Sequence, residues 1–175
     1  MVRRSGENSS DLIITSAHLA SETTGGLSEF EFGINIAFNS FNRWIVQCMR
    51  AAGQMDLSAL DTQVLHLVNH RDRAKRVTDL CIMLNIDDTH IVTYSLKKLQ
   101  KLELIESIKE GSEKTFKTTK QGADLCMEYR NIRSRVLIEN LNSLSESDVD
   151  LRALAKILRT LSGFYDQAAR SAATF

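Results

Sequence analysis

The sequence predicts a mostly α-helical protein that carries one short two-stranded hairpin. Its 175 residues include no proline and only 8 glycines, which favours long uninterrupted helices over a turn-rich β fold. Apolar residues recur at helical spacing through most of the chain. The period changes to that of short strands only between Leu104 and Thr118, where a glycine-containing loop joins two β-compatible segments.

Bulk composition limits the classes of function. Lys with Arg and Asp with Glu each number 22, so net charge indicates no nucleic-acid partner and the distribution of charge has to decide. The three cysteines are far apart and odd in number, which fits neither a disulfide framework nor a zinc ribbon. We see no apolar run long enough for a secretory signal or a membrane span, and therefore expect a cytoplasmic protein.

A long helix is expected near the N-terminal end of the structured chain. Ser28 and Glu31 form a capping-box pattern that marks its start, and Gly53 supplies a stop. Its apolar residues cover more than one face, because Phe32 and Ile36 lie off the main stripe. A helix of this kind must bury two faces, which indicates contact with a second subunit.

Three shorter helices and the hairpin follow in the order of a winged helix-turn-helix. Ser58 caps the first helix, and a basic cluster from Arg71 to Arg76 leads into the second. Asn85–Asp87 is predicted to form the turn, and the third helix runs from about Thr89 to Leu102. The hairpin should lean on these helices, because two strands alone are only marginally stable.

Two long helices close the chain. Thr119 caps the first, which fades near Leu144, and Ser145 with Asp148 resembles a cap for the second. Apolar residues alternate at spacings of three and four along the second helix, from Leu151 to Ala168. This seam is suited to packing against another helix.

The third of the shorter helices has the chemistry of a DNA-reading helix. If Val92, Leu96 and Leu99 face inward, the opposite face presents side chains that bind bases or phosphates. The residues expected to contact DNA here are Thr89, His90, Thr93, Tyr94, Lys97 and Lys98. In a helix-turn-helix this helix enters the major groove. On this helix alone, a solvated lysine-bearing face is an equal alternative.

Charge distribution supports DNA binding more strongly than net charge does. From Lys97 to Lys120 there are seven lysines against four glutamates, so this segment is basic within a neutral chain. Further residues expected at the DNA are Arg71, Arg73, Lys75 and Arg76 before the helix-turn-helix, and Lys109, Lys114 and Lys117 in the hairpin. The alternative function is a winged-helix protein-protein interaction module without sequence-specific DNA binding, whose basic face serves an acidic partner.

The predicted architecture is a winged helix-turn-helix with a two-stranded β-wing, flanked by long dimerisation helices. Residues 1–27 are rich in Ser, Thr, Gly and Asn and are expected to form a flexible arm, either plainly disordered or docking its apolar patch on a partner. Residues 28–57 form a dimerisation helix, 58–119 the winged helix DNA-binding domain, and 120–175 the C-terminal dimerisation helices.

These elements resemble the MarR family of transcriptional regulators. The resemblance lies in Val77–Leu80, Leu84–Ile86, Ile91–Ile105 and Phe116–Gly122, which look like the family's second helix, recognition helix, wing entry and wing exit. It implies a homodimer whose recognition helices read two halves of a pseudo-palindromic operator. It also implies release of the DNA by a small-molecule effector in a crevice between the dimerisation helices and the DNA-binding lobe.

The candidate effector-binding residues are Phe41, Trp44, Cys48 and Leu67, for which ordinary core or dimer packing is the alternative. Two features depart from the family pattern. Glu103 stands where the family often has Gly, so the turn out of the recognition helix must differ or be strained. The wing lacks the family's Asp-x-Arg motif, which leaves any minor-groove contact to lysines.

No catalytic motif accompanies these features. The sequence has no Gly-rich phosphate loop, no nucleophile elbow and no spaced acid pair, so we expect no enzyme and no cofactor. His66 and His70 are four residues apart, a spacing that can bind a metal, but two surface histidines are the simpler interpretation. The cysteines lie on apolar stripes and are expected in the core, with Cys48 as the best redox candidate.

Overall fold

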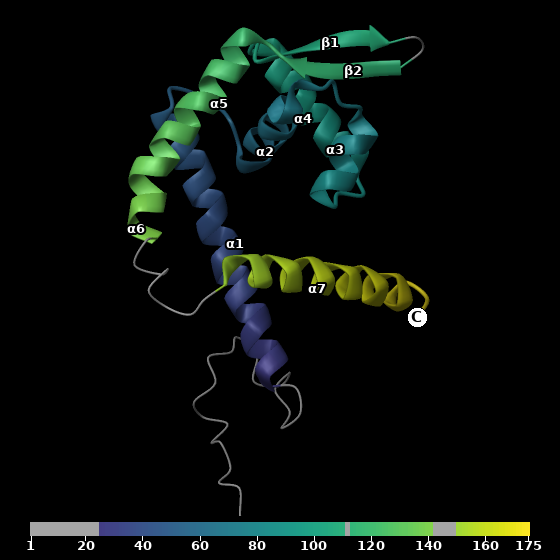
Figure 1. Ribbon diagram of the computed structural model, residues 1–175. Coiled ribbons are helices and arrows are strands. Elements are labelled where there is room, and N and C mark those ends of the chain that lie inside the picture. The colour runs from purple at the N-terminus through teal and green to yellow at the C-terminus, as the bar shows by residue number, and fades with distance from the viewer. Residues whose placement is uncertain (1–24, 111–112, 142–149) are drawn as a thin grey trace, which may run out of the picture. The chain divides into compact units, whose positions relative to one another are not determined.

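The computed structural model describes residues 25–110, 113–141 and 150–175 (Figure 1). The chain divides into two compact units, of which the first ends at Ile132 and the second is Arg133–Phe175. Helices predominate and one two-stranded sheet is present, which confirms the predicted fold class. The arm expected at residues 1–27 lies almost wholly outside the described residues. None of the described helices is long and apolar enough to cross a membrane.

Helix α1 (Gly25–Ala51) begins a turn earlier than predicted. The expected capping pair, Ser28 and Glu31, therefore lies inside the helix, and that prediction of the start was wrong. Nothing in the three residues before Ser28 blocks a helical backbone, since proline is absent and glycine is tolerated in a first turn. The predicted stop is confirmed, because Gly53 follows the helix with a φ of 100°, a conformation that favours glycine.

The two ends of α1 differ in burial. Near its C-terminus Cys48 and Met49 are fully buried in the core of the first unit. In the N-terminal part, Ile36, Phe38 and Phe41 leave more than half of their surface exposed. Apolar side chains of this size are usually covered, so this part of α1 presents an unpartnered face.

Three helices form the helix-turn-helix and its support. They are α2 (Ala59–Asn69), α3 (Val77–Leu84) and α4 (Thr89–Lys101), with a short 3-10 turn, η3 (His70–Asp72), after α2. Ser58 caps α2 as predicted, and Asp88 caps α4 by accepting a hydrogen bond from the His90 N–H. Between α3 and α4, Asn85 adopts a left-handed conformation that turns the chain.

The wing is an antiparallel hairpin of β1 (Ile105–Glu110) and β2 (Glu113–Thr118). Figure 1 shows it at the top of the first unit, above α3 and α4. A single antiparallel bridge joins Lys75 to Phe116, so the segment before α3 pairs with β2 at one residue. The hairpin thus gains the support that two strands alone lack.

One apolar core holds the first unit together. It draws side chains from every helix of the unit and from both strands, and its fully buried large members are Met49, Leu65, Leu80, Leu96, Leu99 and Leu104. Because α4 and β1 both contribute, the core fixes the position of the helix-turn-helix relative to the wing.

Helix α5 (Lys120–Arg133) is joined to the end of α4 through one hydroxyl. Thr119 Oγ1 accepts a hydrogen bond from the Gly122 N–H and donates one to the Glu103 carbonyl, at 3.1 and 2.7 Å. The predicted Thr119 cap is therefore confirmed. Glu103 has a φ of 59°, the left-handed strain expected where a glycine would be more comfortable.

The second unit is described by itself. After Arg133 it contains a π-helical turn, η4 (Ser134–Ile138), a short α6 (Glu139–Leu141) and α7 (Leu151–Ala172). Asp150 caps α7, whereas the predicted cap at Ser145 and Asp148 lies outside the described residues. No residue of α7 is buried, although its apolar side chains follow the predicted spacing of three and four.

Gly122 tests the contact between α5 and the wing entry. A Cβ on Gly122 would lie 2.0 Å from the Leu104 carbonyl oxygen, which is backbone and cannot turn aside. We expect Gly122→Ala to lower the free energy of unfolding by about 3 kcal/mol, or to prevent folding, because it overpacks a buried contact.

Urea unfolding followed by circular dichroism measures this effect. Gly26→Ala is the matched control, because a Cβ on Gly26 meets nothing within 4 Å. Equal stability of the two variants would contradict the close approach at Leu104.

Candidate nucleic-acid interface

Helix α4 is anchored by one fully buried stripe. Val92, Leu96 and Leu99 have 1% or less of their surface exposed, as the sequence predicted. Ser95 lies on the same side of the helix and is also buried, at 2%. Because this stripe has no freedom to turn, it decides which α4 side chains reach solvent.

The opposite side of α4 is a polar, exposed stripe, formed by His90, Tyr94, Lys97 and Lys101. Tyr94 leaves 71% of its surface exposed, which is unusual for a side chain of its size and indicates an unused contact surface. Thr89 is exposed at the first position of the helix, whereas Thr93 lies half-buried at the flank of the stripe. The structure therefore places three of the six α4 residues expected at DNA, namely His90, Tyr94 and Lys97, on one exposed stripe.

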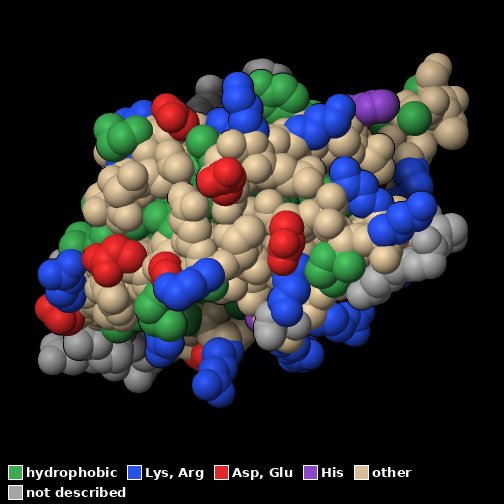
Figure 2. All heavy atoms as spheres, turned by 90° about the horizontal axis from the view of Figure 1, so that it is seen from above, with side chains coloured by type: hydrophobic (Ala, Val, Ile, Leu, Met, Phe, Trp, Pro, Cys, Tyr) green, Lys and Arg blue, Asp and Glu red, His purple; other side chains and the backbone are tan. Residues whose placement is uncertain are grey.

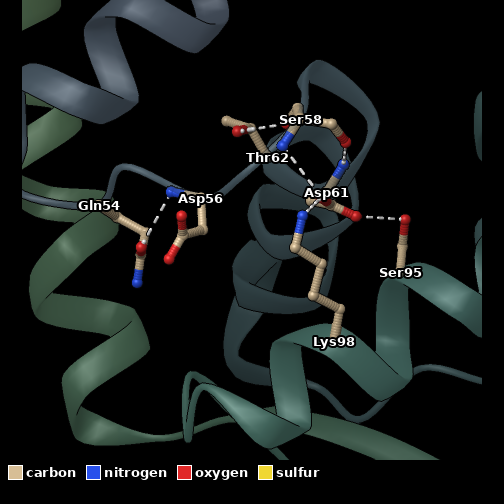
Figure 3. Close-up of polar contacts among 7 residues, drawn as sticks. All are labelled: Gln54, Asp56, Ser58, Asp61, Thr62, Ser95 and Lys98. Carbon is tan, nitrogen blue, oxygen red and sulfur yellow. Dashed lines mark hydrogen bonds and ion pairs between the residues drawn. The ribbon is translucent and has the colours of Figure 1, made fainter.

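Lys98 lies on the edge of this face and is engaged inside the protein. Its Nζ is 2.7 Å from Oδ2 of Asp61, and Ser95 donates a hydrogen bond to Oδ1 of Asp61 at 2.6 Å. Figure 3 shows both side chains extending from α4 toward the start of α2. Asp61 also accepts the Ser58 N–H, while the Ser58 hydroxyl accepts the Asp61 N–H, which completes a capping box.

The environment of Asp61 keeps its carboxylate ionised. Burial by itself raises the pKa of Asp61, but hydrogen bonds from Lys98, Ser95 and Ser58 outweigh burial and bring the pKa below its ordinary value. The pair of Asp61 and Lys98 thus joins α2 to α4 with charge-assisted bonds. Sequence reasoning missed this group. The available signals were the spacing of Ser58 and Asp61 and a serine on the buried stripe of α4.

Arg76 also has partners within the protein. Its guanidinium binds both oxygens of Asp79, at 3.2 and 3.0 Å, and lies 3.5 Å from Glu113 at the start of β2. The hydrogen bonds from Arg76, with the nearby charge of Arg73, lower the pKa of Asp79. Arg76 therefore ties the first turn of α3 to the wing while keeping half of its surface exposed.

The position of Lys75 differs from the expectation that this residue contacts DNA. Its side chain is buried, and its ammonium group donates hydrogen bonds to the backbone carbonyls of His70 and Arg73. In this position Lys75 closes the loop before α3 and is not offered to a phosphate. Arg71 and Arg73, on that loop, are exposed, and Arg71 adopts a left-handed backbone with a φ of 63°.

The wing lysines differ in position. Lys109 and Lys114 are directly opposite each other in the register, one rung from the end of the hairpin, and both are exposed. Like charges in this arrangement repel, so an anion beside them would be stabilising. Lys117 faces Glu106 instead and is half-buried. The ammonium group of Lys114 also lies 5.2 Å from the centre of the Phe116 ring.

The charged side chains are unevenly distributed on the surface. On the face seen from above in Figure 2, Lys and Arg gather toward the right-hand half, where a His also lies, and Asp and Glu are fewer there. The chain is neutral as a whole, so this face carries more positive charge than composition alone suggests.

The candidate effector residues do not share one environment. Cys48 is fully buried, Trp44 and Leu67 are half-buried against the core, and Phe41 is 53% exposed outside it. Three of the four therefore contribute to core packing, which was the alternative interpretation. The effector site stays a prediction.

His66 and the cysteines are packed in the interior. His66 was predicted at the helix surface, but its ring lies edge-on against Tyr129, with centroids 4.5 Å apart, and burial lowers its pKa. All three cysteines are buried as predicted, and burial raises the pKa of Cys126 to about 12. Among the described residues no group of three or more His, Cys, Asp or Glu side chains is placed to hold a metal ion.

The comparisons with known proteins agree with this geometry. Residues 57–122 match the family described as "Winged helix DNA-binding domain". A MarR family transcription regulator of known structure superposes with a TM-score of 0.64 at 16% identity, covering 85% of this chain and 95% of its own. No curated protein matches the sequence.

Two other solved structures share the fold. A mutant of MarR from E. coli complexed with operator DNA gives a TM-score of 0.61 at 16% identity, covering 82% of this chain and 99% of its own. The transcriptional regulator MosR from M. tuberculosis gives 0.58 at 14% identity, covering 80% and 94%. The resemblance to MarR regulators inferred from the sequence is thus confirmed in the fold.

Asp61 gives a test of the bond between α2 and α4. Because its folded pKa lies below the ordinary 3.8, its contribution is fully present above that value and is lost as the pH falls through the folded pKa. We expect Asp61→Asn to lower the free energy of unfolding at pH 7 by about 1.5–3 kcal/mol, the range for hydrogen bonds to charged groups.

Urea unfolding at pH 7 and again below 3.8 measures both effects, and the difference between wild type and variant should shrink in acid. Asp56→Asn is the control, since Asp56 is an exposed carboxylate two residues before Ser58. A constant difference at all pH values would show that the charge of Asp61 is not responsible.

Proposed function

We propose that this chain is a MarR-type transcriptional regulator that binds DNA sequence-specifically, as a homodimer on a pseudo-palindromic operator. The observation that carries the proposal is the exposed stripe of His90, Tyr94, Lys97 and Lys101 on α4, opposite a stripe with no freedom to turn. The match of residues 57–122 to a DNA-binding family supports it, as does the fold shared with a regulator complexed with operator DNA.

Helix α4 supplies both kinds of DNA contact. Its N-terminal residues Thr89 and His90 carry hydrogen-bonding groups suited to base edges, and Tyr94 can pack on a thymine methyl. Lys97 and Lys101 follow on the same face and bind phosphates, which position the helix without reading sequence. The base contacts and the phosphate contacts therefore come from successive turns of one helix.

The wing adds a second contact. Lys109 and Lys114 stand opposite each other near the end of the hairpin, and a DNA phosphate beside them relieves their mutual repulsion. Neither lysine offers the planar guanidinium that suits a narrow minor groove. The wing therefore contributes charge, while α4 contributes specificity.

Two copies of the chain form the proposed working unit. Within the second unit, α7 exposes Leu154, Ile157 and Leu158 to solvent, each at between 45% and 49%. The N-terminal part of α1 exposes Phe38 and Phe41 in the same way. Apolar faces of this kind are usually covered, and the same faces of a second copy can cover them. A dimer also places two α4 helices on the two half-sites of an operator.

Release of the DNA by a small molecule is the part of the proposal that rests on resemblance to MarR regulators. Phe41, Trp44 and Leu67 are the candidate residues with surface available to a ligand, whereas Cys48 is fully buried. A regulator of this kind needs no catalytic centre, and we place it in the cytoplasm.

The salt dependence of DNA binding tests the role of α4. Duplexes selected from a random pool by the wild-type protein serve as the ligand. We expect Lys97→Ala to weaken binding and to reduce the slope of log K against log salt by about 1.8, the value for two lost phosphate contacts, one in each subunit of the proposed homodimer. Fluorescence anisotropy at several salt concentrations gives the slope.

Arg130→Ala is the control, because it removes one charge from an exposed position of α5 outside the winged helix. Its slope should equal that of the wild type. If no duplex is enriched and none binds at moderate salt, the DNA-binding proposal fails, and an acidic protein partner becomes the function to pursue.

Sedimentation tests the homodimer. We expect Leu154→Glu with Leu158→Glu to convert the protein to monomers, because four buried carboxylates per dimer would lose their hydration. DNA affinity should fall with it, since one subunit contacts only one half-site. Arg152→Glu, on the side of α7 away from Leu154, Ile157 and Leu158, should leave the sedimentation coefficient unchanged. A wild type that sediments as a monomer at micromolar concentration would contradict this part of the proposal.

A further inference from the structure

The lysines of α4 divide into two kinds. Lys97 and Lys101 are exposed and have no acidic partner among the described residues. Lys98 is adjacent in sequence, but its side chain is only 30% exposed and its Nζ lies 2.7 Å from the buried carboxylate of Asp61. A cation on the edge of the proposed DNA-binding face is therefore neutralised from inside the protein.

We propose that Asp61 is a specificity-determining residue, which withholds Lys98 from the DNA backbone and holds the rotation of α4. The inference rests on the proposed DNA binding. Phosphate contacts raise affinity for every duplex alike and carry no sequence information. A free ammonium group at Lys98 would add such a contact, so its capture by Asp61 keeps non-specific binding low.

The second part of the role follows from the position of the two partners. Ser95 and Lys98 are three residues apart, on consecutive turns of α4, and they bind different oxygens of the same carboxylate. Rotation of α4 about its axis would break both bonds at once. Asp61 is itself fixed at the start of α2 by the reciprocal bonds with Ser58. The carboxylate therefore adds a polar restraint to the buried stripe, and both together hold the direction in which Tyr94 and Lys97 point.

The bonds to Asp61 persist under the conditions of DNA binding. Asp61 is 3% exposed and accepts hydrogen bonds from Lys98, Ser95 and the Ser58 backbone, all of which favour its ionised form. Water has little access to the pair from the Asp61 side, so the attraction is screened less by salt than an exposed pair would be. A phosphate has to compete with this carboxylate for Lys98.

Three variants separate the roles, namely Lys98→Met, Asp61→Asn and the double variant. Each is compared with the wild type on a selected duplex and on an unrelated duplex, over a range of salt. We expect Lys98→Met and the double variant to keep the wild-type salt slope. Asp61→Asn frees Lys98 in both subunits of the proposed homodimer and should steepen the slope by about 1.8 on both duplexes.

The same measurement gives the specificity ratio. Asp61→Asn should strengthen binding to the unrelated duplex by about ten- to hundredfold at 0.1 M salt, the effect of two added phosphate contacts, one in each subunit. Binding to the selected duplex should gain less, because α4 loses one of the restraints on its orientation, so the ratio of the two affinities falls. The double variant restores weak binding to the unrelated duplex.

Two results would overturn the inference. A slope flattened by Lys98→Met as much as by Lys97→Ala would place Lys98 at a phosphate. An Asp61→Asn protein with unchanged slope and unchanged ratio would make Asp61 a structural residue only. Circular dichroism verifies that each variant is folded, and the double variant, which leaves no unpaired charge, decides the role of Lys98 if a single variant unfolds. Absence of any DNA binding by the wild type is a different outcome, because it rejects the proposed function itself.

Discussion

Helix α4 can bury Val92, Leu96 and Leu99 in only one orientation, and the remaining surface chemistry follows from that constraint. Each of these side chains has 1% or less of its surface exposed, so the helix cannot rotate without opening the core. The position of each polar residue around the helix axis then decides whether its side chain is buried or exposed. Ser95 falls inside, where it needs a partner, and Asp61 supplies one. Tyr94 and the residues one turn away fall outside, where they form the proposed reading face.

Fewer cationic side chains are available to DNA than the sequence suggests. Lys75 donates hydrogen bonds that close a loop, Lys98 binds the carboxylate of Asp61, and Arg76 binds Asp79 and Glu113. These three contacts have a common effect, because each fixes an element that carries exposed residues. Lys75 shapes the loop of Arg71 and Arg73, and Arg76 holds the wing against α3. Cations that hold elements of the proposed interface in place thus lie beside exposed cations such as Arg71 and Arg73.

Exposed apolar faces distinguish both ends of the described chain from the winged helix between them. The N-terminal part of α1 and the whole of α7 expose large apolar side chains. Exposing apolar surface of this size to water is unfavourable, and monomeric proteins rarely do so. The winged helix between them is the opposite case, since its apolar residues form one closed core. Folding of the winged helix and the proposed association of two copies therefore depend on different residues.

The sequence by itself determined the order of the elements, the wing and the buried stripe of α4, because helical and strand periodicities and capping residues act locally. It also placed His90, Tyr94 and Lys97 on one face. Only the tertiary structure decided which cations are free. Lys98 binds Asp61, 37 residues before it, and Arg76 binds not only the nearby Asp79 but also Glu113, 37 residues after it. Local patterns carry no information on such pairs, since folding alone brings the charges within bonding distance.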